Sequence, residues 1–374
     1  MEGPRGLKKE ELDSLKQLQD ICFWKGLVDA FPHLFHEDNF DNIRVIVDKG
    51  QVISCVVMTK QGASIFGCKL AVANIGAVCT HPEYRQRGLA TRLFGDTCKK
   101  AYIDGMDFML VSGGRSLYLR AGCRPIVGCD YSTTITPEQV SLFSDSGLTI
   151  EHCREDDLSS IAAIYRTEPV RFLRRKEDYQ RAFACQRAQG RLSDFLMVKK
   201  GVSLRAYVIL PRPEEKKRAV QIVEYAGERA SLVDALGLLI QNYELEKLSI
   251  HVMGWDTLLK SLLEEKGLKL LPSNASGTAR IVNFPQFMER MRPYFEEIIG
   301  VKLARQLHFV EEDGRFCIKC GDGQVVLSRA EAVQLLFGSK EAELEKLLAS
   351  GGKVHTLLFL ALPIPALWYG LNFA

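Results

Sequence analysis

The sequence has no dominant charge of either sign. Its 374 residues carry 49 Lys and Arg against 46 Asp and Glu, so the formal net charge is only +3. Proteins that hold nucleic acids or anionic membranes through bulk charge have a larger basic excess, gathered on one face. We therefore expect no nucleic acid and no membrane among the partners of this protein.

Long apolar runs and an apolar leader are also lacking. The apolar stretch 357–367 contains Pro363 and Pro365 and is far shorter than the ~20 residues that a membrane helix needs. Residues 1–10 contain no apolar segment of the kind that secretory signal peptides carry. These two absences predict a soluble, cytoplasmic protein.

Cysteine, in contrast, is plentiful. The chain has 11 cysteines, an odd number, and most of them lie in apolar stretches. Without a secretory leader, this pattern predicts reduced thiols rather than a disulfide framework. The spacing Cys317-x-x-Cys320 has no second pair, and residues three apart in a strand point to opposite faces. We therefore expect packing in a hairpin there and no metal site.

The length predicts two or three domains. In the first 147 residues, the pattern predicts a helix at 10–22, strands at 43–48, 52–59, 71–80 and 108–111, and a helix at 89–102. A strand–helix–strand order of this kind favours a mixed α/β, or α+β, layer architecture.

The same order recurs between residues 148 and 284, in the segments 220–225, 232–240 and 248–252, which suggests an internal duplication. The charged segment 211–218 is typical of a hairpin loop.

The basic segment Arg171–Lys176 is most simply explained as the solvent-exposed face of a helix.

A third region covers residues 285–374. The pattern predicts a helix at 286–299 with a break at Pro293, and strands at 315–320 and 324–327. Ser328 and Glu331 have the spacing of a capping box before an apolar helix.

The most informative segment runs from Val78 to Thr91, with the sequence VCTHPEYRQRGLAT. A predicted strand leads into a turn that opens a helix, with Arg85 and Arg87 beside Gly88. Free N–H groups at a helix start, together with arginines, are typical of a phosphate or pyrophosphate site. An arginine-rich surface turn is the alternative.

This segment resembles the acyl-CoA binding motif of the Gcn5-related N-acetyltransferases (GNAT), Arg/Gln-x-x-Gly-x-Gly/Ala, at Arg85, Gly88 and Ala90. The resemblance implies acetyl-CoA as co-substrate, with the pantetheine arm bonded to the strand before the turn. The implied cofactor-binding residues are Val78, Cys79, Thr80, Arg85, Gln86, Arg87, Gly88, Leu89, Ala90, Thr91, Gly113 and Gly114.

The segment Tyr118–Gly122 is similar to the Tyr-x-x-x-Gly-Phe element of the same family, with Cys123 in place of the aromatic residue. The resemblance implies that Tyr118 is the general acid that protonates the leaving thiolate. Simple core packing of Tyr118 is the alternative.

The whole chain resembles the enhanced-intracellular-survival (Eis-type) acetyltransferases. The resemblance rests on residues 78–91, Tyr118, the Leu336–Gly338 stretch and the tail Trp368–Ala374. It implies two tandem GNAT folds, at 1–147 and, in degenerate form, at 148–284, followed by a sterol-carrier-protein-like domain at 285–374. It also implies a homo-oligomer, with a hexamer as the form to test.

In the Eis-type group, the free C-terminal carboxylate enters the N-terminal active site, and here that carboxylate belongs to Ala374. The turn 227–231 in the second region lacks the phosphate motif, and Glu224 and Glu228 would repel a phosphate. We therefore expect only the first region to bind CoA.

These features predict an acetyl-CoA-dependent N-acetyltransferase that acts on a primary amine of a small molecule or peptide, without a metal. The amine attacks the thioester directly in a ternary complex, with Tyr118 as acid and Ala374 as base. Phe23 and Trp24 could face the acceptor or pack in the core, and His33 and His36 are alternative bases. The rival hypothesis is a non-catalytic CoA-binding or lipid-carrier module that kept the fold.

Overall fold

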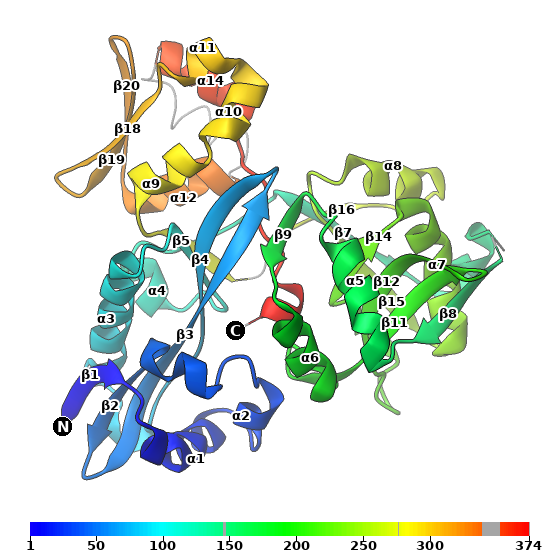
Figure 1. Cartoon of the computed structure of the whole chain (residues 1–374), viewed down its shortest axis with the longest axis horizontal. Coiled ribbons are helices and arrows are strands. Elements are labelled where there is room, and N and C mark those ends of the chain that lie inside the picture. Colours follow the sequence, from blue (N-terminus) through cyan, green and yellow to red (C-terminus); the bar gives the residue numbers. More distant parts are fainter. Residues whose placement is uncertain (145–146, 276, 339–351, 374) are drawn as a thin grey trace. The chain divides into compact units, whose positions relative to one another are not determined.

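The structure, a computed structural model, describes residues 1–144, 147–275, 277–338 and 352–373 (Figure 1). The described chain forms two compact units. Residues 1–127 and 275–367 belong to the first unit, and residues 128–274 and 368–373 belong to the second. The architecture is mixed α/β throughout, as predicted.

The first unit is built on a sheet with the strand order β1-β2-β3-β4-β5-β17-β6. These strands are β1 (Glu2–Gly6), β2 (Ile43–Asp48), β3 (Gln51–Ile65), β4 (Cys68–Thr80), β5 (Phe108–Val111), β17 (Thr278–Ile281) and β6 (Arg124–Pro125). Neighbouring strands are antiparallel except β4 and β5, which are parallel.

Three helices of the first unit matter for the site: α1 (Leu12–Cys22), α3 (Leu89–Ile103) and α4 (Ser116–Arg120). Helix α1 packs on β3 and β4, and α3 packs on β2, β3 and β4. The buried face of α3 carries Leu89, Leu93, Phe94 and Ala101, at the helical spacing that the sequence predicts. Burial of this face fixes where the first turn of α3 lies relative to the end of β4.

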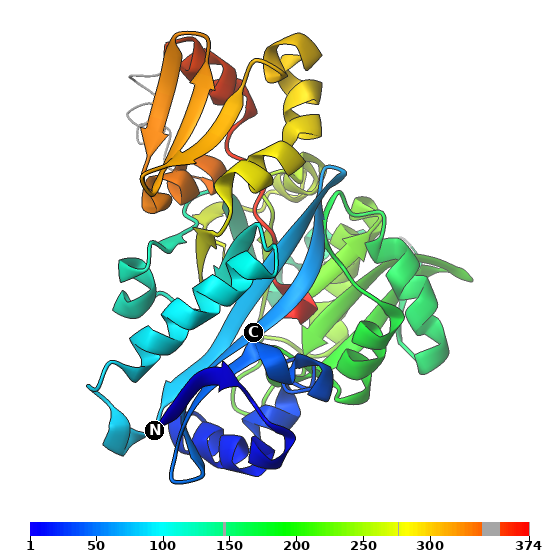
Figure 2. The same ribbon diagram turned by 60° about the vertical axis from the view of Figure 1, so that its left-hand side comes forward.

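The chain after β17 completes the first unit with a small antiparallel sheet in the order β18-β19-β20, coloured orange in Figure 2. Its strands are β18 (His308–Glu312), β19 (Arg315–Cys320) and β20 (Gly323–Leu327), and its helices are α9 (Phe284–Arg290), α10 (Arg292–Ile299), α11 (Val301–Ala304), α12 (Arg329–Phe337) and α14 (Lys353–Ala361). The ring of Phe108 on β5 lies 5.7 Å from Phe287 and 5.2 Å from Phe337. This part therefore shares a core with the main sheet.

Two local predictions for this part are confirmed. The predicted helix 286–299 is two helices, and Pro293 lies in the first turn of the second one, where its missing N–H costs nothing. Ser328 and Glu331 form the predicted capping box: the Ser328 amide donates to the Glu331 carboxylate at 2.7 Å, and the Glu331 amide donates to the Ser328 hydroxyl at 3.2 Å.

The second unit contains two sheets. One has the order β10-β11-β12-β14, with β8 also paired to β11, and the other has the order β13-β15-β7-β16. The strands are β7 (Asp130–Ile135), β8 (Leu148–His152), β10 (Arg187–Ala188), β11 (Arg191–Lys200), β12 (Ser203–Pro211), β13 (Ala219–Gln221), β14 (Glu224–Gly227), β15 (Lys247–Val252) and β16 (Leu271–Ser273). The main helices are α5 (Leu158–Tyr165), α6 (Lys176–Ala184), α7 (Arg229–Asn242) and α8 (Thr257–Glu265).

Two strands pair outside the region to which the predicted domain boundaries assign them. Strand β7, at 130–135, pairs with β15 in the second unit, whereas β17, at 278–281, pairs with β5 and β6 in the first. Both pairings join residues more than a hundred positions apart, so a local pattern gives no sign of them. The division at 147/148 and 284/285 remains a prediction about sequence domains.

The prediction of a solvated helix face at Arg171–Lys176 is wrong. Residues Val170–Leu173 form β9, and the side chain of Arg174 is only 2% exposed. Its guanidinium forms a bidentate ion pair with Glu224, at 2.6 and 2.5 Å. The carboxylate compensates the buried charge, which a sequence pattern cannot reveal because the partner lies 50 residues away.

The end of the described chain packs into the second unit. Trp368 stacks on His251 with ring centroids 3.7 Å apart, and its indole N–H donates to the Val223 carbonyl at 2.7 Å. The Leu371 amide donates to Glu224, and the Asn372 side chain accepts from Arg174 at 2.7 Å. We call residues 368–373 the tail segment.

Candidate active site

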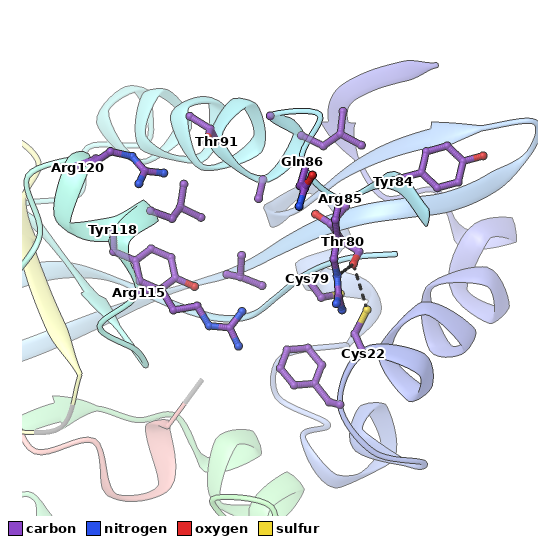
Figure 3. Close-up of a pocket in the computed structure, with 16 residues that line it drawn as sticks. Cys22, Cys79, Thr80, Tyr84, Arg85, Gln86, Thr91, Arg115, Tyr118 and Arg120 are labelled. Carbon is purple, nitrogen blue, oxygen red and sulfur yellow. Dashed lines mark hydrogen bonds between the residues drawn. The ribbon is translucent and has the colours of Figure 1, made fainter. Parts of the chain in front are cut away.

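A cavity of about 630 Å³ opens in the first unit beside the end of β4 (Figure 3). It lies between the last residues of β4, the turn that follows, the start of α3 and the helix α4. Its lining residues are Cys22, Phe23, Val78, Cys79, Thr80, Tyr84, Arg85, Gln86, Gly88, Leu89, Ala90, Thr91, Arg115, Leu117, Tyr118 and Arg120.

One wall of the cavity is an unpaired strand edge. The parallel ladder between β4 and β5 ends at the pair Ile75 and Val111, but β4 continues to Thr80. A bulge lies at this point, because two positions of β4, Ala77 and Val78, face one of β3, Val56, and Ala77 has a φ of +47°. On the side away from β3, no strand of the described chain pairs with residues 78–80, so this edge is open to an extended ligand that carries amides.

The start of α3 forms the next wall. Gly88 precedes the helix with a φ of +73°, a conformation that favours glycine, and no side chain caps the helix there. A Cβ atom at Gly88 would meet nothing within 4 Å, so the space before the helix is open. The first-turn amides of α3 have no intrahelical acceptor and point toward this space, which suits an anion.

Several arginines bring positive charge to the cavity, at the start of α3 and on α4. The Arg85 Nε donates to the Thr80 carbonyl at 3.3 Å, and the same guanidinium also interacts with the Cys22 thiol. Arg115 and Arg120 extend from the N-cap and the last turn of α4. The Tyr84 ring lies beneath Arg87, 4.9 Å from its guanidinium carbon, and the Tyr84 hydroxyl donates to Asp48 at 3.0 Å.

Tyr118 lies at the far wall, on α4, with its hydroxyl directed into the cavity (Figure 3). The residue is only 5% exposed, and its ring packs against Phe94 on α3 with centroids 5.2 Å apart. Burial raises the pKa of Tyr118 to about 12, against a smaller opposite effect of the Arg115 charge. The phenol therefore keeps its proton at neutral pH and can act as a donor.

Cys22 is an unexpected member of the lining. Its thiol lies 3.5 Å from the Thr80 carbonyl, next to Arg85 (Figure 3). A hydrogen bond from the Cys79 thiol and, to a smaller extent, the Arg85 guanidinium lower the pKa of Cys22 to about 7, despite partial burial. The thiol of Cys55 lies 3.6 Å from that of Cys79, so the thiols of Cys22, Cys55 and Cys79 form one cluster beside β4.

The structure brings most of the predicted site residues together in this cavity. Arg87, Gly113 and Gly114 do not line it: Arg87 donates to the Glu83 carbonyl, and the Gly113 carbonyl accepts from Thr278 at 2.9 Å. His33 and His36 are not in the lining either. Ala374 lies outside the described residues.

Sequence reasoning missed Cys22, Tyr84, Arg115, Leu117 and Arg120. Arg115 and Arg120 flank Tyr118 in the sequence, so the proximity of two cations to a predicted acid was a usable signal. No such signal marks Cys22, because α1 brings it to β4 only through tertiary packing.

Within the described ranges, no group of three or more His, Cys, Asp or Glu side chains could hold a metal ion. All 11 cysteines are free thiols. The helices that the structure describes include none that is both long and apolar enough to cross a bilayer.

The cavity combines an open strand edge, an uncapped helix start and a protonated phenol. Comparisons with known proteins show what the domain that holds this cavity is similar to. Residues 4–126 match the sequence model of the acetyltransferase (GNAT) domain. The first unit thus carries a GNAT acetyltransferase domain, and the protein is an acyltransferase of a fold that uses acyl-CoA.

Solved structures extend the fold similarity over the whole chain. A GCN5-related N-acetyltransferase from Anabaena variabilis has 16% identity and a TM-score of 0.69, with coverage of 97% of this chain and 98% of that one. A probable N-acyltransferase from Enterococcus faecalis has 16% identity and a TM-score of 0.70, with the same coverage. Eis1 from Mycobacterium abscessus has 11% identity and a TM-score of 0.64, with 96% of each chain covered. No curated protein has significant sequence similarity to the chain.

Proposed function

We propose that this protein transfers an acetyl group from acetyl-CoA to a primary amine by direct attack in a ternary complex. The observation that carries the proposal is the continuity of the cavity from the open start of α3, along residues 78–80 of β4, to the hydroxyl of Tyr118. A pyrophosphate fits the helix start and Arg85, and the two amides of a pantetheine arm match the unpaired strand edge.

In this proposal Tyr118 is the general acid. The leaving thiolate has a reference pKa near 8.5, so a hydrogen bond from a neutral phenol stabilises the charge that develops on sulfur. Burial against Phe94 keeps Tyr118 protonated and holds its ring in place. Acid–base assistance of this kind contributes about 10²–10⁴-fold to the rate.

The acceptor of the amine proton in this proposal is the terminal carboxylate of Ala374. A lysine-like amine has a pKa of about 10.4, so presenting it neutral at pH 7 costs roughly 4–5 kcal/mol. A carboxylate attracts the ammonium form and accepts the proton once attack makes the nitrogen strongly acidic. Arg174 and Glu224 bond to Asn372 and Leu371 of the tail segment, which precede that terminus in sequence.

The proposal includes the rest of the Eis-type organisation: a degenerate second GNAT domain, a sterol-carrier-protein-like C-terminal domain and a cytoplasmic homo-oligomer. The start of α7 supports a second unit that does not bind CoA. There the Glu168 carboxylate already accepts from the Gly227 amide at 3.0 Å and from Arg229 at 2.6 Å. An internal carboxylate thus stands where a phosphate would bind.

A panel of primary amines tests the proposal. Untagged protein is mixed with acetyl-CoA and with polyamines, aminoglycosides or lysine peptides, and the release of free CoA is measured. We expect acetylation of at least one class. Binding of acetyl-CoA by calorimetry without turnover on any amine would favour the rival, a non-catalytic CoA-binding or lipid-carrier module.

A C-terminal extension tests the base separately. Three added glycines move the terminal charge by several ångströms, at about 3.3–3.6 Å per extended residue, and 1 Å can cost about 10²-fold in rate. The extended protein should bind acetyl-CoA but lose transfer, whereas Ala374→Gly should remain active. Normal turnover of the extended protein would rule out the terminal carboxylate.

A further inference from the structure

A second cavity, of about 590 Å³, lies in the first unit and extends along α3 away from the active site. We call it the α3 groove. Helices α3, α4 and α12 and strand β17 form its walls. Its lining residues are Thr91, Phe94, Gly95, Cys98, Lys99, Tyr102, Ile103, Leu117, Arg120, Ala121, Arg280, Val282 and Arg329. The volume is within the range of small-molecule sites, about 300–1,000 Å³.

The floor of the α3 groove is apolar. Phe94 and Val282 are almost fully buried beneath it, and Leu117 and Cys98 complete the surface. At the mouth, on the last turn of α3, Tyr102 and Ile103 are 56% and 80% exposed. A ligand for this groove therefore has an apolar body that would cover these side chains.

The walls of the groove carry an excess of positive charge. Four cations line it: Lys99, Arg120, Arg280 and Arg329. Among the described residues, only Arg329 of these four has a carboxylate partner, Glu311. Arg280 instead donates to the carbonyls of Ala121 and Ile281, at 2.9 and 3.4 Å, which holds its guanidinium without neutralising it.

Arg280 and Arg329 act on the same space. Burial and, next, the charge of Arg280 lower the pKa of Arg329, so the two guanidinium groups repel each other. Both charges also partly offset the effect of burial on the pKa of Cys98, which lines the groove. The two guanidinium groups repel each other in the apolar groove. An anion bound between them would offset this repulsion, so the pair favours an anionic ligand.

We propose that the α3 groove binds an amphipathic carboxylate of the fatty-acid kind. The carboxylate accepts hydrogen bonds from Arg280 and Arg329, whose planar forks match its two oxygens. The alkyl chain lies over Phe94, Leu117 and Val282. A highly charged nucleotide fits this surface less well, because most of the lining is apolar.

Calorimetric titration of the full-length protein with dodecanoate, kept below its micelle-forming concentration, tests the proposal. We expect binding of one molecule per chain, with or without saturating acetyl-CoA. Arg280→Met keeps the length and apolar stem of the side chain but removes one fork, and should weaken dodecanoate binding at least tenfold. Dodecanol, which has no charge, should bind the Arg280→Met variant as well as it binds the wild type.

Two further variants make the result decisive. Arg329→Met removes the other fork and leaves Glu311 without its ion-pair partner, so it should also weaken dodecanoate binding, which provides the same test if Arg280→Met does not fold. Lys69→Met removes an exposed cation on β4 outside both cavities and should leave binding unchanged. Three outcomes would overturn the proposal: no binding of dodecanoate to the wild type, an equal loss of dodecanoate affinity in all three variants, or full competition between dodecanoate and acetyl-CoA. Full competition would assign the groove to the nucleotide end of the cofactor.

Discussion

At the scale of single residues, Tyr118 provides the sharpest test of the chemistry. Tyr118→Phe keeps the ring against Phe94 and removes only the hydroxyl. If that hydroxyl protonates the leaving thiolate, kcat should fall roughly 10²-fold while the affinity for acetyl-CoA stays the same. Stopped assays of CoA release, together with calorimetry, measure both quantities.

The pH dependence adds a second readout for Tyr118. Because burial raises its pKa to about 12, the phenol remains protonated across the range in which such assays are run. The wild-type rate should therefore not decline near pH 10 through ionisation of Tyr118. The pH profiles of the wild type and of Tyr118→Phe should have the same shape in that range. Wild-type turnover in the variant would reduce Tyr118 to a packing residue.

Cys22 allows a test of the electrostatics of the cavity. Its pKa of about 7 predicts that alkylation by iodoacetamide rises through a midpoint near pH 7, below the usual value of about 8.5. Because the Cys79 thiol is the main cause and Arg85 a smaller one, Cys79→Ala and Arg85→Gln should both raise that midpoint. Mass spectrometry of the alkylated peptide measures it.

Cys185 is the matched control for Cys22, because it is half-buried and burial raises its pKa. It should react with iodoacetamide only at higher pH. Identical pH profiles for the two thiols would contradict the hydrogen-bonding environment described for Cys22.

At the scale of elements, the start of α3 carries the cofactor hypothesis. Gly88 has a φ of +73°, which Asn and Asp tolerate better than other residues with side chains. Gly88→Asn and Gly88→Asp therefore form a nearly isosteric pair that differs in charge. The carboxylate would lie where the pyrophosphate is proposed to bind, and repulsion between close charges costs about 1–4 kcal/mol.

We expect Gly88→Asp to bind acetyl-CoA at least tenfold more weakly than Gly88→Asn in calorimetry. The two variants should have similar thermal midpoints, since the backbone strain is shared. Equal affinities would place the pyrophosphate elsewhere.

The tail segment depends on a buried ion pair. Arg174 and Glu224 are 2% and 4% exposed, and Glu224 also accepts from Tyr207 and the Leu371 amide. Arg174→Met leaves an uncompensated buried carboxylate and should lower the free energy of unfolding by about 3–5 kcal/mol. Adding Glu224→Gln removes that charge but keeps an acceptor, so the double variant should be more stable than Arg174→Met alone.

Urea unfolding monitored by tryptophan fluorescence can measure this difference, since Trp255 and Trp368 both belong to the second unit. If the double variant is no more stable than Arg174→Met alone, the destabilisation does not come from the uncompensated charge of Glu224.

At the scale of the whole molecule, the sequence predicts structural features made of consecutive residues. It does not predict contacts that packing makes between residues far apart in the chain. The strand, turn and helix of residues 78–91 follow one another along the chain, so their spacing alone predicts the phosphate-type turn. Cys22 reaches the same cavity only because α1 packs on β4. Arg174 looks solvated until Glu224, 50 residues later, is placed beside it.

The fold shows the same division. Strands β2 and β5 have the predicted bounds, and α3 differs by one residue, because each has a clear local pattern. Strand β1 was missed, since the segment Glu2–Gly6 has two glycines and a proline and is extended only through its pairing with β2. The segment 220–225 contains parts of two strands, β13 and β14, that belong to different sheets.

The position of β17 between β5 and β6 has a consequence for how the protein is made. Residues 1–127 leave the ribosome roughly 150 residues before β17, a delay of roughly 8–30 s at ~5–20 residues per second. During that interval β5 presents an unpaired edge, and an exposed edge of this kind invites pairing with other chains. The edge of β5 that β17 later covers therefore stays open until Ile281 has left the ribosome.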